Sequence, residues 1–231
     1  MKPKAILLDL DNTVYNYAPC NEAGVEAVIQ AAGCSREQYD LAKATVKDTI
    51  PNSQGASHCR LLYCLQLTED LTGRTDLIRA REWHAAFWSA YFGVMRPDDG
   101  VAEMITRWKQ EQVRIGWVTD FTTERQILKL EKLELLEAAD FLVTSEQVGV
   151  EKPHGKGARL ALKKLGCEPG EAWFIGDDLQ KDVAMALDLK MQKVIWMNRS
   201  ASSTSSTSSD LPYMSVSSWG EILEHWNALS N

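Results

Sequence analysis

Residues 9–13 of the chain read Asp-Leu-Asp-Asn-Thr and follow directly on the apolar run of residues 5–8. A run this short and this apolar is typical of a buried parallel strand. Asp9 and Asp11 are therefore predicted to emerge at the carboxyl end of a strand, where open α/β sheets bind their ligands. Two neighbouring acids repel one another, and a divalent cation that prefers hard oxygen ligands, Mg²⁺, would offset that repulsion. One carboxylate can then attack phosphorus while the other handles the proton of the leaving group.

Three more groups of polar residues each follow a predicted strand further along the chain. They are Thr119 and Asp120 after residues 113–118, Lys152 and Pro153 shortly after residues 141–144, and Gly176, Asp177, Asp178 and Asp182 after residues 172–175. A doubly wound sheet brings the carboxyl ends of its strands to one edge, so these distant residues are expected to become neighbours.

Each group has something that phosphoryl transfer requires. Mg²⁺ between Asp9 and Asp177 would neutralise the repulsion between an attacking carboxylate and a phosphate. Lys152 would add a fixed positive charge, and the Thr119 hydroxyl would donate to the phosphate oxygens. Asp11 would protonate the leaving alkoxide and then activate water as a general base.

The pattern between the first strand and the later ones is helical. Ser35 is predicted as an N-cap, with Gln38 completing a capping box. Helical spacing covers residues 22–32, 41–50, 58–71 and 77–92, and residues 14–19 read as a turn-prone link. This block shows no strand-like alternation, so it is predicted to be an all-helical insertion.

Helices and strands alternate from residue 100 onward, which predicts βαβ units and a parallel sheet with helices on both faces. The predicted helices are 100–110, 123–136, 154–165, 179–189 and 219–229, and two further strands are 193–196 and 213–216. We expect an α/β protein with a doubly wound, Rossmann-like sheet. Its catalytic core would comprise residues 1–15 and 96–231, with a helical domain of residues 16–95 inserted between the first two core strands.

The composition of the chain argues against some classes of binding partner. The chain has 231 residues, 45% of them hydrophobic, and a formal net charge of -7 without a long run of Lys or Arg. This argues against nucleic acid as the main partner. The five cysteines match no zinc or disulfide framework and are expected to be reduced thiols in a cytoplasmic protein. No stretch is long enough to span a bilayer, and the Ser/Thr-rich residues 200–209 are expected to form a flexible surface loop.

Taken together and in this order, the four motifs resemble those of the haloacid dehalogenase superfamily of phosphohydrolases, over nearly the whole chain. The resemblance implies that Asp9 is the nucleophile and carries an aspartyl-phosphate, and that Asp11 is the acid and base. It also implies that the Asp11 backbone carbonyl and Asp177 complete the Mg²⁺ ligands. Asp178 or Asp182 would support the metal, although acids also simply favour helix N-termini. The helical insertion would be a cap that excludes water and selects the substrate.

Two positions depart from the family pattern. Asp120 stands where members commonly have Asn, and His154 follows Lys-Pro where an acidic residue or Asn is common. Asp120 is a candidate substrate-binding residue beside Thr119, but its charge is unfavourable near a phosphate unless its side chain turns away or meets a cation. We expect little effect on the chemistry from His154.

Several residues of the helical block are candidates for contacts with the non-phosphate part of a substrate: His58, Arg60, Trp83, His84, Trp88 and Tyr91. Aromatic rings can stack on a base or a sugar. However, Trp83, Phe87 and Tyr91 recur on one helix face, which favours a core position for most of them. Arg60 is the first candidate for a substrate contact.

The function predicted from the sequence is a Mg²⁺-dependent phosphatase of a small phosphorylated metabolite, either a nucleoside monophosphate or a sugar phosphate, because a cap blocks large substrates. A phosphomutase uses the same residues and stays open. The carboxylate of Asp11 argues against a dehalogenase, and the helical insertion argues against a phosphoryl-receiving signalling domain. A phosphate-binding regulatory protein without turnover is a further alternative. No nucleic-acid or membrane partner is expected, and the oligomeric state stays open.

Overall fold

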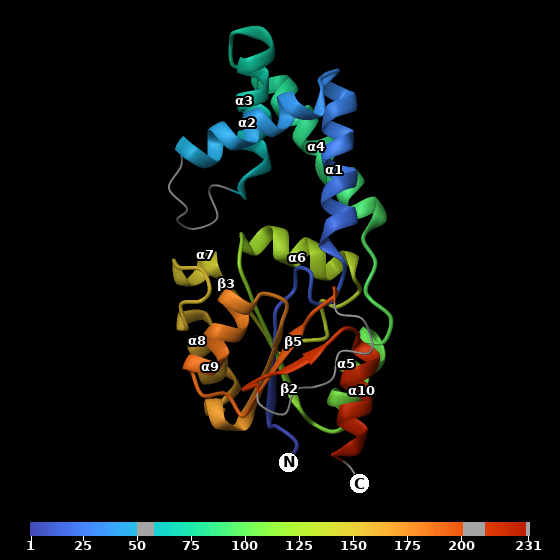
Figure 1. Cartoon of the computed structure of the whole chain (residues 1–231), viewed down its shortest axis with the longest axis vertical. Coiled ribbons are helices and arrows are strands. Elements are labelled where there is room, and N and C mark those ends of the chain that lie inside the picture. Colours follow the sequence, from blue (N-terminus) through green and yellow to red (C-terminus); the bar gives the residue numbers. More distant parts are fainter. Residues whose placement is uncertain (50–57, 201–210, 230–231) are drawn as a thin grey trace. The chain divides into compact units, whose positions relative to one another are not determined.

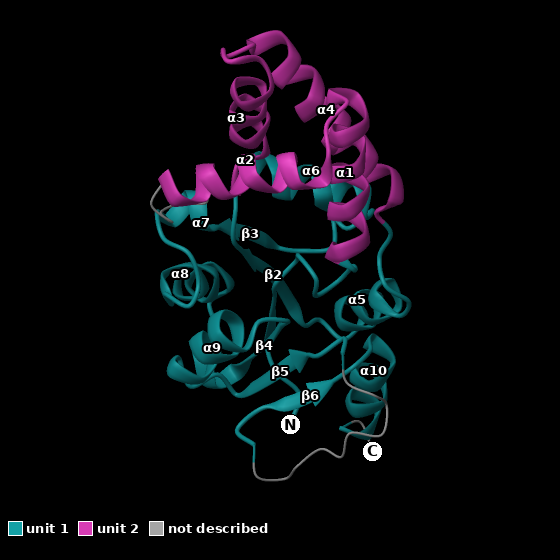
Figure 2. Cartoon of the chain, turned by 45° about the horizontal axis from the view of Figure 1, so that its top comes forward, with its two compact units in different colours: residues 1–16, 96–231 teal, residues 17–95 magenta. Residues whose placement is uncertain are grey.

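The computed structural model of the protein describes residues 1–49, 58–200 and 211–229. The chain forms two compact units, Met1–Asn16 with Arg96–Asn231 and Tyr17–Met95 (Figure 2). Ile50, the predicted end of a helix, and all but the first residue of the predicted loop 200–209 lie outside the described residues. In the part of the chain described, no helix is long and apolar enough to cross a membrane.

The first unit is built on a six-stranded sheet with the strand order β3-β2-β1-β4-β5-β6, in which every neighbouring pair is parallel. The strands are β1 (Ala5–Leu8), β2 (Arg114–Thr119), β3 (Phe141–Thr144), β4 (Ala172–Gly176), β5 (Lys193–Met197) and β6 (Met214–Val216). The direction of strand order changes between β1 and β4, which is the topological switch point of a doubly wound sheet. The predicted fold class is thereby confirmed.

Helices cover both faces of this sheet (Figure 1). On one face, α8 (Lys156–Leu165) and α9 (Ala184–Asp188) pack over a cluster that includes Leu7 and Phe174. On the other face lie α5 (Val101–Gln110) and α10 (Trp219–Ala228). Indole rings fill this second layer through the contacts Trp108–Trp219, Trp108–Trp226 and Trp173–Trp226. Burial on both faces explains why β1 is apolar at every position.

Three elements of this unit differ from the sequence-based expectation. Helix α6 (Thr123–Lys132) ends before residue 136, because Glu134 adopts a left-handed backbone conformation with φ 60°. A short helix, α7 (Ser145–Val148), follows β3 directly and is capped by a Thr144–Gln147 capping box. The predicted helix 179–189 is in fact a π-helical turn, η3 (Leu179–Val183), followed by α9.

The second unit consists of α1 (Tyr17–Ala32), α2 (Arg36–Thr49), α3 (Arg60–Thr72) and α4 (Leu77–Val94), together with their described connections. Helix α1 begins within the predicted link. Pro19 is tolerated there because it falls in the first turn, where the missing N–H costs no hydrogen bond. The Ser35–Gln38 capping box forms as expected. Phe87 packs against Gly24, where a side-chain Cβ would lie 2.7 Å from the Phe87 ring.

The two segments that lead out of and back into the sheet unit are joined to each other. The Asp98 N–H donates to the Val14 carbonyl at 2.9 Å. Arg199, just after β5, pairs with the Asp98 carboxylate and donates to the carbonyls of Asn12 at 2.6 Å and Thr13 at 3.3 Å. These contacts attach both segments to the loop that follows β1.

Candidate active site

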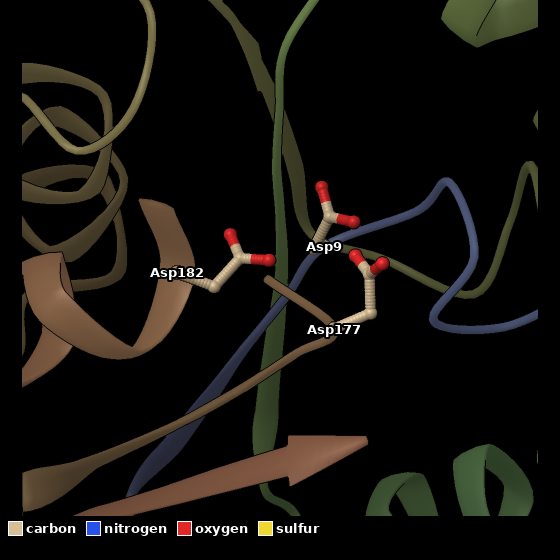
Figure 3. A group of neighbouring side chains, drawn as sticks. All are labelled: Asp9, Asp177 and Asp182. Carbon is tan, nitrogen blue, oxygen red and sulfur yellow. The ribbon is translucent and has the colours of Figure 1, made fainter. Parts of the chain in front are cut away.

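Three carboxylates meet at the switch point. Asp9 follows β1 and Asp177 follows β4, and the Asp9 N–H extends the pairing of these strands by donating to the Ile175 carbonyl at 3.0 Å. One carboxylate oxygen each from Asp9, Asp177 and Asp182 lies within 4.8 Å of the others (Figure 3). Such a group of hard oxygen donors suits a divalent cation.

Gly176 makes room for Asp182 in this group. A Cβ at residue 176 would lie 2.5 Å from the Asp182 carboxylate carbon, so only glycine allows the approach. The Asp178 carboxylate has a different place, because it caps η3 by accepting from the N–H groups of Gln180 and Lys181. The structure thus separates two acids that the sequence left as alternatives: Asp182 lies in the cluster, and Asp178 is a helix cap.

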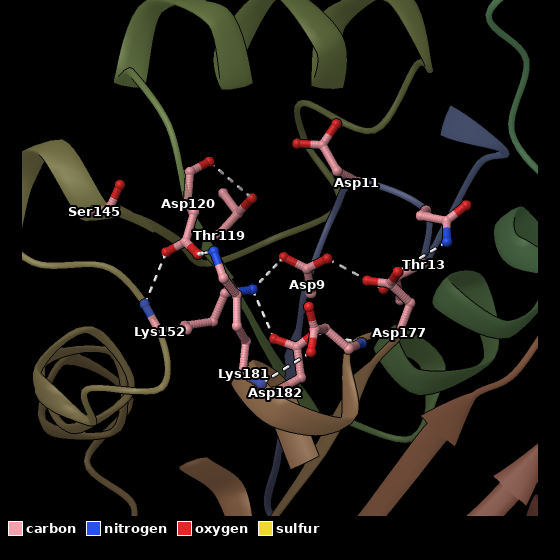
Figure 4. Close-up of polar contacts among 12 residues, drawn as sticks. Asp9, Asp11, Thr13, Thr119, Asp120, Ser145, Lys152, Asp177, Lys181 and Asp182 are labelled. Atoms are coloured by element: carbon pink, nitrogen blue, oxygen red, sulfur yellow. Dashed lines mark hydrogen bonds and ion pairs between the residues drawn. The ribbon is translucent and has the colours of Figure 1, made fainter. Parts of the chain in front are cut away.

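Lys152 supplies positive charge to the cluster. Its Nζ lies 2.5 Å from Asp9 Oδ1 and 2.7 Å from Asp182 Oδ1 (Figure 4). The side chain is buried. Burial alone lowers the pKa of Lys152, but the carboxylates of Asp182 and Asp9 outweigh it and hold that pKa well above its usual value. Lys152 is therefore a permanent cation beside Asp9.

The clustered acids hold their protons more tightly than isolated carboxyls do. Burial raises the pKa of Asp9 to about 7, where the attraction of Lys152 opposes the repulsion from Asp182 and Asp11. Burial, together with the charge of Asp9, raises the pKa of Asp177 to about 6. A metal ion that binds here must displace these protons.

The negative charge of Asp120 is paired with the Lys181 ammonium. Its Oδ2 lies 3.3 Å from Lys181 Nζ, which is also 3.2 Å from Glu151 Oε2. Its Oδ1 accepts the N–H of Lys152 at 3.0 Å. The extra charge of Asp120 is therefore paired, and its carboxylate helps to place the Lys152 backbone.

Asp11 is held by side chains on a different element, α6. Lys129 Nζ lies 2.5 Å and 2.8 Å from the two Asp11 carboxylate oxygens, and Gln126 Nε2 donates to Oδ2 at 2.9 Å. The Tyr15 hydroxyl also donates to Oδ1. Burial alone raises the pKa of Asp11, but Lys129 and these hydrogen bonds hold it below its usual value. Gln126 Nε2 also donates to Thr119 Oγ1 at 2.6 Å, which links Asp11 to Thr119.

Four residues of this site were not predicted from the sequence: Asn12, Gln126, Lys129 and Lys181. Asn12 Nδ2 donates to Asp177 Oδ2 at 2.8 Å from a left-handed backbone conformation that Asn tolerates. Gln126 and Lys129 share the buried face of α6 with Leu130, and buried polar residues require buried partners. The sequence alone does not show that this face of the helix is the buried one.

Arg60 belongs to the helical unit and has partners there. Its guanidinium donates to the Tyr17 hydroxyl at 2.6 Å, to Asn21 Oδ1 at 3.2 Å and to the His58 carbonyl at 2.5 Å. Trp83 and Tyr91 are buried along α4, as expected for core residues. A contact between Arg60 and a substrate stays a prediction.

Comparison with known proteins establishes the family. A model of the haloacid dehalogenase-like hydrolases matches residues 3–189. The chain is 35% identical over 202 residues to a ribulose-1,5-bisphosphate 5-phosphatase of Halopiger xanaduensis, covering 83% of this chain and 84% of that protein. It is 25% identical over 189 residues to a glyceraldehyde 3-phosphate phosphatase of Methanocaldococcus jannaschii, covering 81% and 82%.

A third relative is the N-acylneuraminate-9-phosphatase of Rattus norvegicus, at 25% identity over 232 residues, covering 95% of this chain and 92% of that protein. The fold is shared with a crystal structure of a HAD phosphatase from Thermococcus onnurineus, at TM-score 0.71 and 21% identity over 98% of both chains. The protein belongs to the haloacid dehalogenase-like hydrolases, and its phosphatase relatives make it a phosphoric monoester hydrolase. The predicted family and enzyme class are confirmed.

Replacing Gly176 with Ala is expected to force the Asp182 carboxylate out of the cluster, since the new methyl group would overlap it. We expect weaker Mg²⁺ binding and a free energy of unfolding lower by about 1–3 kcal/mol. Calorimetric Mg²⁺ titration and denaturant unfolding measure the two effects. Gly170→Ala is the control, because nothing lies within 4 Å of a Cβ there. An unchanged affinity in Gly176→Ala would argue against a contribution of Asp182 to metal binding by the cluster.

Binding of a divalent cation such as Mg²⁺ to the cluster is expected to release protons in acidic solution. Because the pKa values of Asp9 and Asp177 are raised to about 7 and about 6, the metal-free protein holds protons there that the metal displaces. Affinity should therefore fall as the pH drops through this range, and proton release should fade above about pH 8. Calorimetry in buffers of different ionisation enthalpy counts the protons. Equal release at acidic and alkaline pH would contradict these pKa values.

Proposed function

We propose that the protein is a Mg²⁺-dependent phosphatase that removes the phosphate of a small sugar phosphate through an aspartyl-phosphate on Asp9. The observation that carries the proposal is the arrangement around Asp9. Its carboxylate is buried at the switch point, between the Lys152 ammonium and the acids Asp177 and Asp182. A nucleophile, a fixed cation and oxygen donors for a metal are thus in one place.

The residues fit a Mg²⁺ ion by their chemistry. The carboxylates of Asp9 and Asp177, with the backbone carbonyl of Asp11, would hold it, and Asp182 would support it. When bound, Mg²⁺ would neutralise charge on the cluster and on the phosphate oxygens. Asn12 would orient Asp177 through its hydrogen bond of 2.8 Å.

The first step is attack by a carboxylate oxygen of Asp9 on phosphorus. A P–O bond to Asp9 forms as the P–O bond to the leaving alkoxide breaks. Lys152 and Thr119 are buried donors that would stabilise the charge on the phosphoryl oxygens. Asp120 holds the Lys152 backbone N–H, and Gln126 donates to the Thr119 hydroxyl. Little reorganisation is then required during the reaction.

Asp11 handles the protons. It gives one to the departing alkoxide and later takes one from the water that cleaves the aspartyl-phosphate, which releases inorganic phosphate and regenerates Asp9. In the free protein Lys129 favours the ionised form of Asp11. A bound phosphate dianion adds negative charge nearby, which shifts Asp11 back toward its protonated form.

The names of the relatives narrow the class of substrate. They act on ribulose 1,5-bisphosphate, glyceraldehyde 3-phosphate and N-acylneuraminate 9-phosphate, all phosphate esters of sugars or sugar-like molecules. They favour a sugar phosphate over a nucleoside monophosphate for this chain. The helical unit, Tyr17–Met95, is the proposed cap that selects the sugar.

Asp9→Asn is expected to abolish release of inorganic phosphate from ribulose 1,5-bisphosphate and from p-nitrophenyl phosphate, because the amide cannot form the acyl phosphate. The wild-type protein should lose activity in EDTA and regain it with Mg²⁺. Circular dichroism checks that the variant folds. Full activity of folded Asp9→Asn would end the nucleophile assignment, and activity in EDTA would end the metal requirement.

Asp11→Asn should slow hydrolysis of alkyl phosphates by about 10²–10⁴-fold, the usual contribution of a general acid or base. Aryl phosphates should suffer less in the step that forms the aspartyl-phosphate, because their leaving groups need less protonation. Pre-steady-state bursts of p-nitrophenol isolate that step. Equal losses of this step with both kinds of ester would argue against the acid role.

A further inference from the structure

Lys129 is a buried charge with no direct part in the proposed bond-making or proton-transfer steps. It lies in α6 and is 3% exposed, and Gln126 on the same helix face is fully buried. Removing an ammonium group from water is costly, so a buried lysine requires close compensation. That compensation comes from Asp11, whose two oxygens lie 2.5 Å and 2.8 Å from Lys129 Nζ.

The contact fixes the carboxylate in more than one direction. Because Lys129 bridges both oxygens, it restrains rotation of the carboxylate plane about its bond to the rest of Asp11. Gln126 Nε2 restrains the Oδ2 edge at 2.9 Å and lies 2.6 Å from Thr119 Oγ1. The acid and base is thereby held at a defined position relative to the residue that would contact the phosphate.

Helix α6 is itself attached to the sheet edge near its first turn. The Phe121 N–H donates to Ser145 Oγ at 2.9 Å, and the Thr123 N–H donates to Glu146 Oε2 at 2.8 Å. Phe121, whose φ of 96° is unusual for a residue with a side chain, forms the turn from β2 into the helix. Its ring centroid lies 5.6 Å from Lys129 Nζ. Lys129 therefore acts from a supported element.

We propose that Lys129 is a positioning residue for Asp11, and that its ammonium orients the Asp11 carboxylate for proton transfer to the leaving group. The inference rests on the proposed function, in which Asp11 is the acid and base. A misplacement of about 1 Å in a catalytic group can cost about 10²-fold in rate. The loss should appear where proton transfer limits the reaction, with alkyl phosphates.

The test compares Lys129→Met with the wild-type protein on two substrates, ribulose 1,5-bisphosphate and p-nitrophenyl phosphate, in the presence of Mg²⁺. For the alkyl ester we expect kcat to fall about 10- to 100-fold with little change in KM. For the aryl ester, the burst rate should fall less than about 3-fold, because formation of the aspartyl-phosphate then needs little protonation. Comparing two substrates with one preparation cancels any partly unfolded fraction.

Two further variants separate positioning from simple stability. Lys129→Arg keeps the charge and several donors and should recover part of the alkyl activity. Lys132→Met removes an exposed lysine from the same helix and should leave both rates unchanged. If Lys129→Met does not fold, Lys129→Gln, which keeps a donor, takes its place and should show the same selective loss.

Equal losses on both substrates, no loss, or an Arg variant no better than Met would each overturn the positioning role. These results differ from failure of the proposed function itself. That failure would appear as a wild-type protein that hydrolyses neither ester, or as a folded Asp9→Asn variant that keeps its activity, and the inference about Lys129 would fall with it.

Discussion

The structure of the site depends on the repulsion between buried carboxylates that the sheet forces together. Asp9, Asp177 and Asp182 lie close enough to share a cation, and Lys152 supplies only one positive charge to them. The remaining imbalance is visible in the raised pKa values of Asp9 and Asp177. An excess of buried negative charge favours binding of a divalent cation, and in the proposed function such a cation would offset the negative charge of a bound phosphate.

The acids around the cluster are paired with different cations. Asp120 is paired with Lys181 and serves the Lys152 backbone, so its departure from the common Asn does not add a free charge. Asp11 is paired separately with Lys129 on α6. The two carboxylates of the Asp-x-Asp motif therefore have different cations and opposite pKa shifts. This separation suits one acid that makes a covalent bond and another that exchanges protons.

Much of this arrangement follows from the sequence. The apolar runs and their spacing predicted the parallel sheet, and the strand ends predicted that Asp9 and Asp177 lie near each other. The partners of Asp11 did not follow, because Gln126 and Lys129 are read as part of an amphipathic helix until the fold shows which side is buried. The choice between Asp178 and Asp182 needed the approach of η3 to Gly176, which depends on the absence of a single Cβ. The left-handed residue that ends α6 early, Glu134, carries no obvious sequence signal.

The hydrogen bond between Val14 and Asp98 has a consequence for how such a protein can diversify. The chain leaves the sheet unit and returns to it at adjacent points, so everything between them is an excursion from an otherwise closed scaffold. Segments with neighbouring ends can be exchanged, lengthened or trimmed without rebuilding the scaffold that they interrupt. Under the proposed function, substrate recognition could therefore change within Tyr17–Met95 while the residues around Asp9, which belong to the other compact unit, stay the same.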